Sequence, residues 1–464
     1  MIKNIFSSKF KKKIAIIDDK NNKYSYWQIN EDLNNYNFIL KDKGICFLEG
    51  ANQYESIVFY LFCLKFKIPI FLVEKLNEIH QSKLINEYKP KYIVSKNLIK
   101  NKNYILEFCL DNLNVYKYIY IINFKINNKI AILLTTSGTM GNKKFVKISL
   151  KNITKNAKQI QEYLKINSKS ITITTLPFNY SYGLSIINSH LISGAKIILN
   201  NSSVISRDFK NKLNNYKVTN FGGVPYTYSL LNKINFFKDK FKHLEYVTQA
   251  GGKLKTQDCE LLLDYAKLNK FQFIIMYGQT EASPRISYLP FKNLSDKIGS
   301  IGIPIPGGKI DILDKKRKKV INPFQEGEIV YRGSNVSLGL VTKKIDLLIG
   351  DEFNGILRTG DIGYFDNENF FYITGRVNRF AKIFGKRINL DHIQSIINKK
   401  FISICLSDDE HLIIYYDLNY SKSDIVNELV EYTGLNKNFI LVYKVKKLER
   451  NTSGKIIIKN YKNV

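Results

Sequence analysis

Short apolar runs alternate with amphipathic stretches in the N-terminal part of the chain. Runs with the length and composition of strands lie at 14–17, 45–48, 68–73, 92–94 and 118–122. Between them, the stretches at 27–40 and 52–66 carry apolar residues at helical spacing. Strands that alternate with helices form parallel sheets covered by helices, so the pattern predicts an α/β fold.

A second series of the same kind follows further along the chain. Its strand-like runs lie at 171–176, 195–199, 220–222, 246–249 and 271–276. A helix is predicted to begin after Ser149, because serine is a good N-cap and Ile153, Ala157 and Ile160 share one helical face. From about Gly299 the runs become shorter and turn-rich, which predicts an antiparallel or barrel-like piece.

The most distinctive polar segment is 135–144, which reads TTSGTMGNKK and follows an apolar run at 131–134. Glycines let the backbone approach a ligand closely, while hydroxyls, amides and a lysine suit a polyphosphate. The segment is not a Walker A loop, because the residues after Lys144 have the pattern of a second strand rather than a helix. It therefore predicts a hairpin whose loop holds phosphate.

Four further segments downstream complete a recognisable order. They are MYGQTE at 276–281, RTGD at 358–361, GRVN at 375–378 and NTSGK at 451–455. In this order and spacing the five segments resemble the AMP-forming adenylating enzymes, which include acyl-CoA synthetases, the adenylation domains of peptide synthetases, and luciferases. The resemblance covers nearly the whole chain. It implies that a carboxylic acid is joined to the α-phosphate of ATP with release of pyrophosphate, and that a thiol then displaces AMP.

The resemblance also implies a set of ATP-binding residues, with Mg²⁺ as cofactor. The set comprises Thr136, Ser137, Gly138, Thr139, Gly141, Lys144, Gly252, Tyr277, Gly278, Asp361 and Arg376. Tyr277 would stack on adenine, and Asp361 would accept the ribose hydroxyls. Thr280 and Glu281 would be catalytic, with the carboxylate of Glu281 as a Mg²⁺ ligand.

By the same resemblance, the acid pocket would be lined by residues from three loops. They are Phe178, Asn179, Tyr180, Tyr182, Gly183, Val224, Pro225 and Gly251. Asn179 stands where amino-acid-activating domains have an aspartate for the substrate ammonium group. Because an amide is neutral, an α-amino acid is disfavoured. The aromatic residues favour a compact or aryl acid over a long chain.

The expected architecture is a large N-terminal domain, 1–377, of βα-sheet subdomains plus the barrel-like piece, and a small mobile C-terminal α/β lid, 378–464. Family members place a hinge, usually an aspartate, where this chain has Asn378. Lys455 on the lid would bridge the carboxylate and the α-phosphate, and Lys382 and Gly385 would lie on the lid face used for transfer to the thiol. CoA is the expected acceptor.

The formal net charge of +31 raises nucleic acid or an anionic membrane as a partner. The lysines are scattered, and the abundance of lysine, asparagine and isoleucine matches an AT-rich coding sequence, so nucleic-acid binding is not expected.

Five cysteines without a Cys-x-x-Cys pair argue against a disulfide framework or a zinc site and fit a reducing compartment. The apolar stretch at 57–73 is interrupted by Lys65, Lys67 and Pro69, so we expect no membrane span and a cytoplasmic location.

Two alternatives remain at this point. The acyl group could pass to the phosphopantetheine arm of a separate carrier protein instead of CoA. A basic binding protein that has the fold without catalysis is an alternative from another class. The presence of Lys144, Glu281, Asp361 and Lys455 argues against it.

Overall fold

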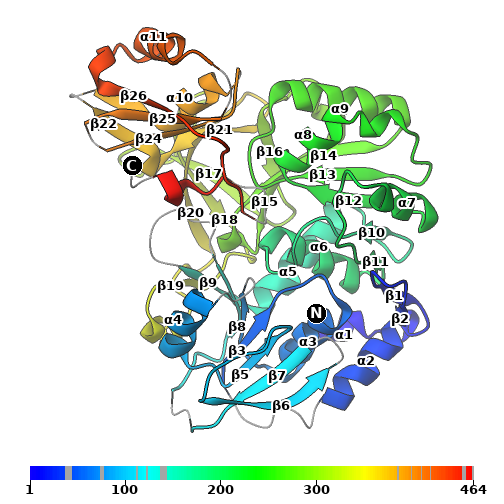
Figure 1. The fold of residues 1–464 in the computed structure, drawn as a ribbon. Coiled ribbons are helices and arrows are strands. Elements are labelled where there is room, and N and C mark those ends of the chain that lie inside the picture. Colours follow the sequence, from blue (N-terminus) through cyan, green and yellow to red (C-terminus); the bar gives the residue numbers. More distant parts are fainter. Residues whose placement is uncertain are drawn as a thin grey trace.

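Two large sheets and a smaller C-terminal region make up the fold (Figure 1). The computed structural model describes residues 1–36, 44–73, 78–110, 113–121, 124–135, 144–383, 386–398, 400–408, 410–417, 420–451 and 456–461. Within these ranges, thirteen strands form the first sheet and eight form the second.

The first sheet has a parallel half and an antiparallel half. Its strands, in spatial order, are β17 (Lys309–Leu313), β18 (Gly327–Arg332), β20 (Ile356–Phe365), β21 (Phe371–Arg376), β16 (Ser300–Pro304), β15 (Arg285–Leu289), β14 (Gln272–Gly278), β13 (Tyr246–Gln249), β12 (Asn220–Gly223), β10 (Ile171–Ile173), β11 (Lys196–Ile198), β1 (Ile14–Ile17) and β2 (Lys23–Ser25). The strands from β14 through β13, β12, β10 and β11 to β1 are parallel, whereas those from β15 to β17 are antiparallel. The turn-rich stretch after Gly299 is thus antiparallel, as expected.

The second sheet contains the N-terminal βα series. Its strands, in order, are β19 (Gly339–Val341), β9 (Phe145–Ser149), β8 (Ile130–Thr135), β4 (Ile70–Val73), β3 (Cys46–Glu49), β5 (Tyr92–Ser95), β7 (Leu113–Tyr118) and β6 (Tyr104–Leu110). One strand prediction is wrong. The strand expected at 118–122 ends at Tyr118, because the buried apolar face belongs to Leu113, Val115 and Tyr116, while Ile121 is 88% exposed.

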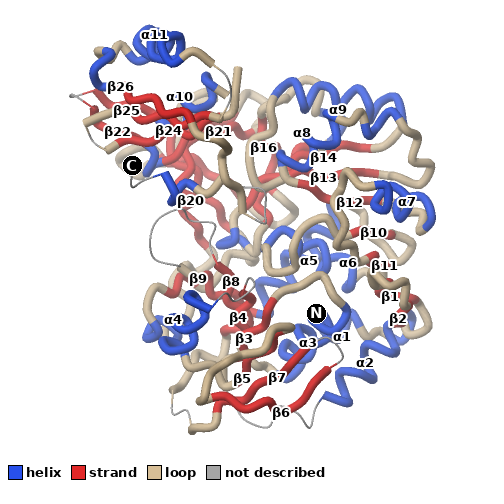
Figure 2. Tube along the Cα trace, in the orientation of Figure 1, coloured by secondary structure: helices blue, strands red, loops and turns tan. Residues whose placement is uncertain are grey.

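Helices fill the space between the two sheets and cover their outer faces (Figure 2). They are α1 (Ile2–Ile5), α2 (Tyr26–Asn35), α3 (Tyr54–Phe66), α4 (Glu78–Tyr88), α5 (Leu150–Tyr163), α6 (Ser181–Ile192), α7 (Arg207–Asn215), α8 (Pro225–Lys233) and α9 (Thr256–Asn269). Short 3₁₀ turns are η1 (Ser8–Phe10), η3 (Phe236–Lys238), η4 (Thr280–Ala282), η5 (Phe291–Asn293), η6 (Lys344–Leu348), η7 (Val377–Arg379), η8 (Lys437–Phe439) and η9 (Ile458–Tyr461). One core cluster joins α3, α5 and α6 to strands of both sheets, so these helices hold the sheets together.

Helix α5 begins where its sequence predicts. The Ser149 hydroxyl accepts from the amide of Asn152, and the Asn152 side chain accepts from the amide of Ser149, which forms a capping box. Ile153, Ala157 and Ile160 are buried on one face of the helix, as their spacing indicates. The helix thus fixes the end of β9, the strand that follows the glycine-rich loop.

The C-terminal region, residues 378–461, has its own secondary structure and its own core. It contains β22 (Phe380–Ile383), β23 (Lys386–Asn389), α10 (Leu390–Ile397), β24 (Ser403–Ser407), β25 (Leu412–Tyr416), α11 (Lys422–Thr433) and β26 (Ile440–Lys444). Its main apolar cluster is formed from residues between Ala381 and Val442. Together with the large sheet-rich part, this smaller α/β region confirms the predicted fold class. No helix in the described ranges has the length and apolar composition needed to cross a membrane.

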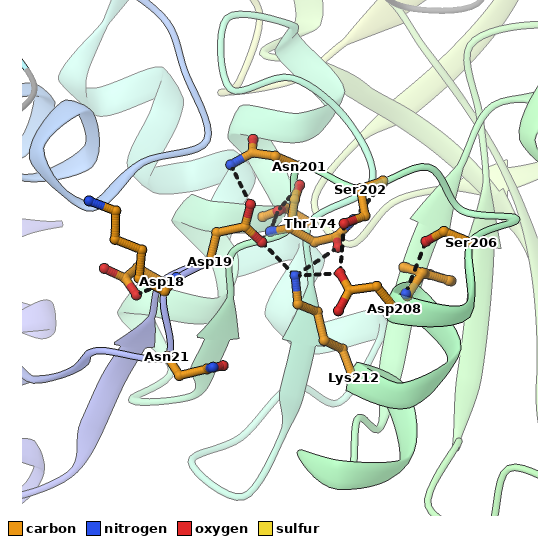
Figure 3. A network of polar contacts seen from close by, with 12 residues as sticks. Asp18, Asp19, Asn21, Thr174, Asn201, Ser202, Ser206, Asp208 and Lys212 are labelled. Atoms are coloured by element: carbon orange, nitrogen blue, oxygen red, sulfur yellow. Dashed lines mark hydrogen bonds and ion pairs between the residues drawn. The ribbon is translucent and has the colours of Figure 1, made fainter.

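A polar network ties the start of the chain to α7 (Figure 3). Lys212 of α7 is 8% exposed and forms ion pairs with Asp19, just after β1, and with Asp208, one helical turn earlier. The Asn201 side chain also donates to Asp19, at 3.0 Å. The buried ammonium group is therefore fully matched by carboxylates, which is the usual condition for burying a charge.

Candidate functional site

The glycine-rich segment connects two antiparallel neighbours in the second sheet. Thr135, the last residue of β8, is the Cα partner of Phe145, the first residue of β9. Lys144 directly precedes β9 and is exposed. Thr136, Ser137, Gly138, Thr139 and Gly141 lie outside the described residues. The hairpin predicted on either side of them is confirmed, and a strand rather than a helix follows the loop.

A compact polar cluster lies where β14, β20 and β21 come together; we call it the Asp361 cluster. Asp361 is 1% exposed, and its carboxylate accepts hydrogen bonds from the Tyr277 hydroxyl and, at 2.9 Å, from Gln279 Nε2. Arg376, the Cα partner of Asp361 across β20 and β21, forms an ion pair at 2.8 Å with its side chain 62% exposed. Burial and the Asp361 carboxylate hold the pKa of Tyr277 well above its usual value, so its hydroxyl stays a donor.

Thr280 and Glu281 follow the Asp361 cluster on the short turn η4. Thr280 Oγ1 lies 3.2 Å from Ser181 Oγ at the start of α6, which brings the turn against the predicted acid pocket. No three His, Cys, Asp or Glu side chains converge as a metal site within the described ranges. A single carboxylate such as Glu281 nonetheless suits Mg²⁺, which usually takes one or two protein carboxylates and completes its shell with phosphate oxygens and water.

Several predicted pocket residues meet in one apolar cluster. Tyr182, Val224 and Ala250 are buried together, and Tyr180 packs against them. Gly251 has φ +89°, and a Cβ there would lie 2.6 Å from the Tyr180 hydroxyl. Only glycine suits both the backbone angle and the close approach. Pro225 begins α8 and lies 3.3 Å from the position a Cβ on Gly252 would take, so the three loops do converge.

Three residues predicted for the pocket have other packing partners. Phe178 is fully buried in the core between the two sheets and makes an edge contact with Tyr60, so it does not line this cluster. Asn179 packs against Gly50, where an added Cβ would approach within 2.5 Å. Gly183 lies inside α6, and a Cβ there would lie 2.4 Å from the carbonyl oxygen of Pro177. Its role in the structure is to let the preceding loop lie close to the helix.

The remaining predicted residues lie in the C-terminal region. Asn378 is in η7, between β21 and β22, and Lys382 is in β22. Gly385 and Lys455 lie outside the described residues. On either side of 452–455, Arg450 and Ile456 form an isolated antiparallel bridge. The Arg450 guanidinium lies 4.7 Å from the ring centroid of Tyr226 on α8, so this part of the C-terminal region touches the large domain beside Pro225.

The sequence reasoning missed three features of the site. Gln279 links Tyr277, Asp361 and the Thr359 carbonyl, although its position inside the MYGQTE segment could have drawn attention to it. Arg285 at the start of β15 is buried against Tyr182, with its Cζ 4.1 Å from the ring centroid. The contact between Arg450 and Tyr226 joins residues far apart in sequence and had no local signal.

Comparison with known proteins shows which family the chain belongs to. A family model described as AMP-binding enzyme matches residues 6–341, which is most of the chain. The chain belongs to the AMP-binding enzyme family. The match includes strands of both large sheets, the glycine-rich loop, the predicted acid pocket, Tyr277, Thr280 and Glu281, and it ends before β20 and β21. This confirms the family resemblance stated from the five segments.

Curated relatives include ligases and a luciferase. The chain is 28% identical over 268 residues to a 2-succinylbenzoate–CoA ligase of Bacillus subtilis, covering 58% of this chain and 53% of that protein. It is 28% identical over 293 residues to a long-chain-fatty-acid–CoA ligase of Escherichia coli, covering 61% and 50%. It is 25% identical over 280 residues to a luciferin 4-monooxygenase of Photuris pensylvanica, covering 59% and 50%. The chain thus spans about half the length of the curated relatives it matches.

Solved structures resemble the chain over its full length. An AMP complex of o-succinylbenzoate CoA synthetase from Bacillus subtilis superposes with a TM-score of 0.78 at 21% identity, covering 99% of this chain and 98% of that one. ATP-bound MatB from Rhodopseudomonas palustris superposes with a TM-score of 0.75 at 19% identity, covering 100% and 99%. At these identities the likeness shows the fold, including the small C-terminal α/β region.

Proposed function

We propose that this protein activates a carboxylic acid as its acyl-adenylate, with release of pyrophosphate, and then transfers the acyl group to the thiol of CoA. The observation that carries the proposal is the Asp361 cluster. A carboxylate that is 1% exposed and held by Tyr277, Gln279 and Arg376 is a preorganised acceptor for the ribose hydroxyls of ATP. The ligases among the curated relatives support the same reaction class.

Each half of the reaction has candidate residues around this cluster. The Tyr277 ring offers a face for adenine, and the Thr280 hydroxyl can donate to the α-phosphate. Glu281 would hold Mg²⁺, which neutralises charge on the phosphates when bound. Lys144 and the preceding loop would hold the β- and γ-phosphates. Lys455 would bring a positive charge to the point where the acid carboxylate meets the α-phosphate, because two anions must be held in line there.

We further propose that residues 378–464 form a mobile lid with its hinge at Asn378. The separate core of the C-terminal region and the position of Asn378 between β21 and β22 support a boundary there. The contact between Arg450 and Tyr226 supports this proposal, because it can hold the lid against the large domain during adenylation. Release of this contact would free the lid to present Lys382 and Gly385 for the thiol step, since one lid position cannot serve both steps.

The test of the proposed function is acid-dependent exchange of pyrophosphate with ATP, screened across a library of carboxylic acids. At least one acid should give exchange, and the same acid should yield a thioester when CoA is added. If a thioester forms only with a phosphopantetheine-bearing carrier protein, adenylation stands and the acceptor assignment is wrong. Failure of every acid to give exchange, with the protein still binding ATP, would favour a binding protein on this fold.

The expected compartment follows from the cysteines. All five are unpaired, and four are buried. Thiols of this kind persist in a reducing environment, so we propose the cytosol as the site of action.

A further inference from the structure

Arg285 is a buried cation without a carboxylate partner among the described residues. It is 3% exposed at the start of β15, and its Nε has no hydrogen-bond partner. Among the described residues, no carboxylate forms an ion pair with it. Two other buried cations in the described part of the chain are paired with carboxylates. Lys147 forms an ion pair with Glu352 at 2.6 Å, and Lys212 lies between Asp19 and Asp208 (Figure 3).

Three phenols lie near the guanidinium, and we call Tyr163, Tyr180 and Tyr182 the tyrosine cluster. Tyr163 shares a side-chain hydrogen bond with Arg285. Burial raises the pKa of Tyr163 to about 12 although the charge of Arg285 acts in the opposite direction. Burial likewise raises the pKa of Tyr180 and Tyr182 against the same charge. All three rings are therefore neutral near pH 7 and supply no compensating negative charge.

The hydroxyls of the tyrosine cluster are partly committed elsewhere. Tyr182 hydrogen-bonds to the Thr248 backbone carbonyl at 2.9 Å, and Tyr163 donates to the sulfur of Met276 at 3.0 Å. The ring of Tyr182 gives Arg285 a cation–π contact, with the guanidinium carbon 4.1 Å from the ring centroid. A cation–π contact offsets only part of the free-energy cost of burying a charge without an ion-pair partner. An anion from outside the chain would complete the site.

The location of Arg285 indicates which anion this is. Tyr180 and Tyr182 belong to the predicted acid pocket, and the Tyr180 hydroxyl reaches Gly251 on its far side. Arg285 is also the Cα partner of Gly278, which directly follows Tyr277 and lies two residues before Thr280. The guanidinium therefore lies beside the nucleotide residues, against the ring of Tyr182.

We propose that Arg285 binds a second carboxylate of the acid substrate, so that the enzyme prefers a compact dicarboxylic acid over the matching monocarboxylic acid. This proposal rests on the proposed function and names its substrate class. The planar guanidinium can hold a carboxylate through two parallel hydrogen bonds, and the neutral phenols leave its charge available. The tyrosine rings provide the walls for a short or aromatic carbon skeleton.

The test uses the full-length protein and acids matched in size. Succinate is compared with butyrate, glutarate with pentanoate, and phthalate with benzoate, in acid-dependent release of pyrophosphate from ATP. At least one dicarboxylate should have a kcat/KM on the order of 100-fold above its partner, since charge-assisted hydrogen bonds of a bidentate pair discriminate at about this level. Arg285→Met should lose that preference. Arg285→Lys should retain part of it, because lysine keeps the positive charge but cannot form the two parallel hydrogen bonds.

A binding readout separates this proposal from the proposed function. The preferred dicarboxylate, without ATP, should raise the melting temperature of the wild-type protein and of Arg332→Met, but not that of Arg285→Met. Arg332 is the matched control, because it is paired with Asp311 on the surface of β18. Without ligand, Arg285→Met should melt no lower than wild type, because it removes an unpaired buried charge.

Two results would overturn the dicarboxylate proposal. One is a wild-type preference for the monocarboxylic acid in every pair, which would leave the adenylation reaction standing. The other is an equal loss with both members of a pair in Arg285→Met, which would mean that Arg285 contacts the carboxylate under activation or serves only the packing. Absence of acid-dependent pyrophosphate release with all acids would instead refute the proposed function.

Discussion

The contact between Arg450 and Tyr226 predicts a selective effect on the first half-reaction. Tyr226 lies on α8 in the large domain, and Arg450 lies just before the segment that carries Lys455. Replacing Tyr226 with leucine removes the aromatic face but keeps an apolar side chain. If the contact holds the lid over the large domain, fewer molecules of Tyr226→Leu should have Lys455 at the site.

The structure sets the size of the effect. The guanidinium is 4.7 Å from the ring centroid, within the range of a cation–π contact, and Tyr226 is 40% exposed. Cation–π contacts contribute ~0.5–1 kcal/mol at exposed sites and ~2 kcal/mol when desolvated. A half-exposed pair should contribute about 1 kcal/mol, which corresponds to roughly a fivefold change in the ratio of closed to open lid.

The assay follows the two half-reactions separately. Pyrophosphate release reports adenylation, and thioester formation from synthetic acyl-AMP and CoA reports the second step. Tyr226→Leu should slow adenylation about fivefold and leave the second step at or above its wild-type rate, because that step needs the lid elsewhere. Tyr226→Phe is the matched control, since it keeps the ring face and should behave as wild type.

The reasoning fails if Tyr226→Phe loses as much activity as Tyr226→Leu, because the hydroxyl rather than the ring would then matter. It also fails if both half-reactions slow equally, which would indicate damage to the large domain. A double-mutant cycle with Arg450→Ala gives a further check. The two substitutions should be non-additive by about the energy of the contact.

Other residues of the site give further predictions. Lys455→Ala should slow adenylation on the order of 10²–10³-fold and spare thioester formation from acyl-AMP, measured as above; equal losses would contradict the assignment. Glu281→Gln should weaken the binding of Mg²⁺, so that adenylation falls and partly recovers at high Mg²⁺; an unchanged Mg²⁺ titration would remove Glu281 from the site. Asp361→Asn should raise the KM for ATP more than the KM for the acid, because it alters the acceptor for the ribose. Asn378→Pro should spare pyrophosphate exchange and depress thioester formation, and equal loss of both would place the hinge elsewhere.

Much of the fold could be predicted because its signals are local. The strands at 14–17 and 246–249 were predicted with the observed bounds, since each is a short run that contains residues typical of strands. The capping box at Ser149 is contained in four consecutive residues. The wrong strand prediction at 118–122 also came from a local signal. Apolar composition alone does not reveal which residues face the sheet's core, and the buried face here belongs to the preceding residues.

The candidate site could be predicted only for residues that lie in the sequence segments shared with the family. Tyr277, Asp361 and Arg376 were assigned from separate segments, and the structure brings them within hydrogen-bonding distance. Phe178 was assigned to the pocket by its neighbours in sequence, but its ring points into the core. The lack of a counter-ion at Arg285 could not be predicted at all, because it depends on every residue packed around β15.

The topology explains why nucleotide and acid residues are neighbours. Strand β14 is the last of the parallel strands, and β15 reverses direction beside it. Ligands in open α/β sheets gather at the carboxyl ends of the strands, and Val224, Gly251 and Thr280 each follow such an end. The turn from β14 into β15 then carries the chain from the Asp361 cluster directly to Arg285. That turn fixes the positions of the Asp361 cluster and of Arg285 relative to each other. Side chains on β15 and α6 can therefore change which acid fits, while the nucleotide residues keep their geometry.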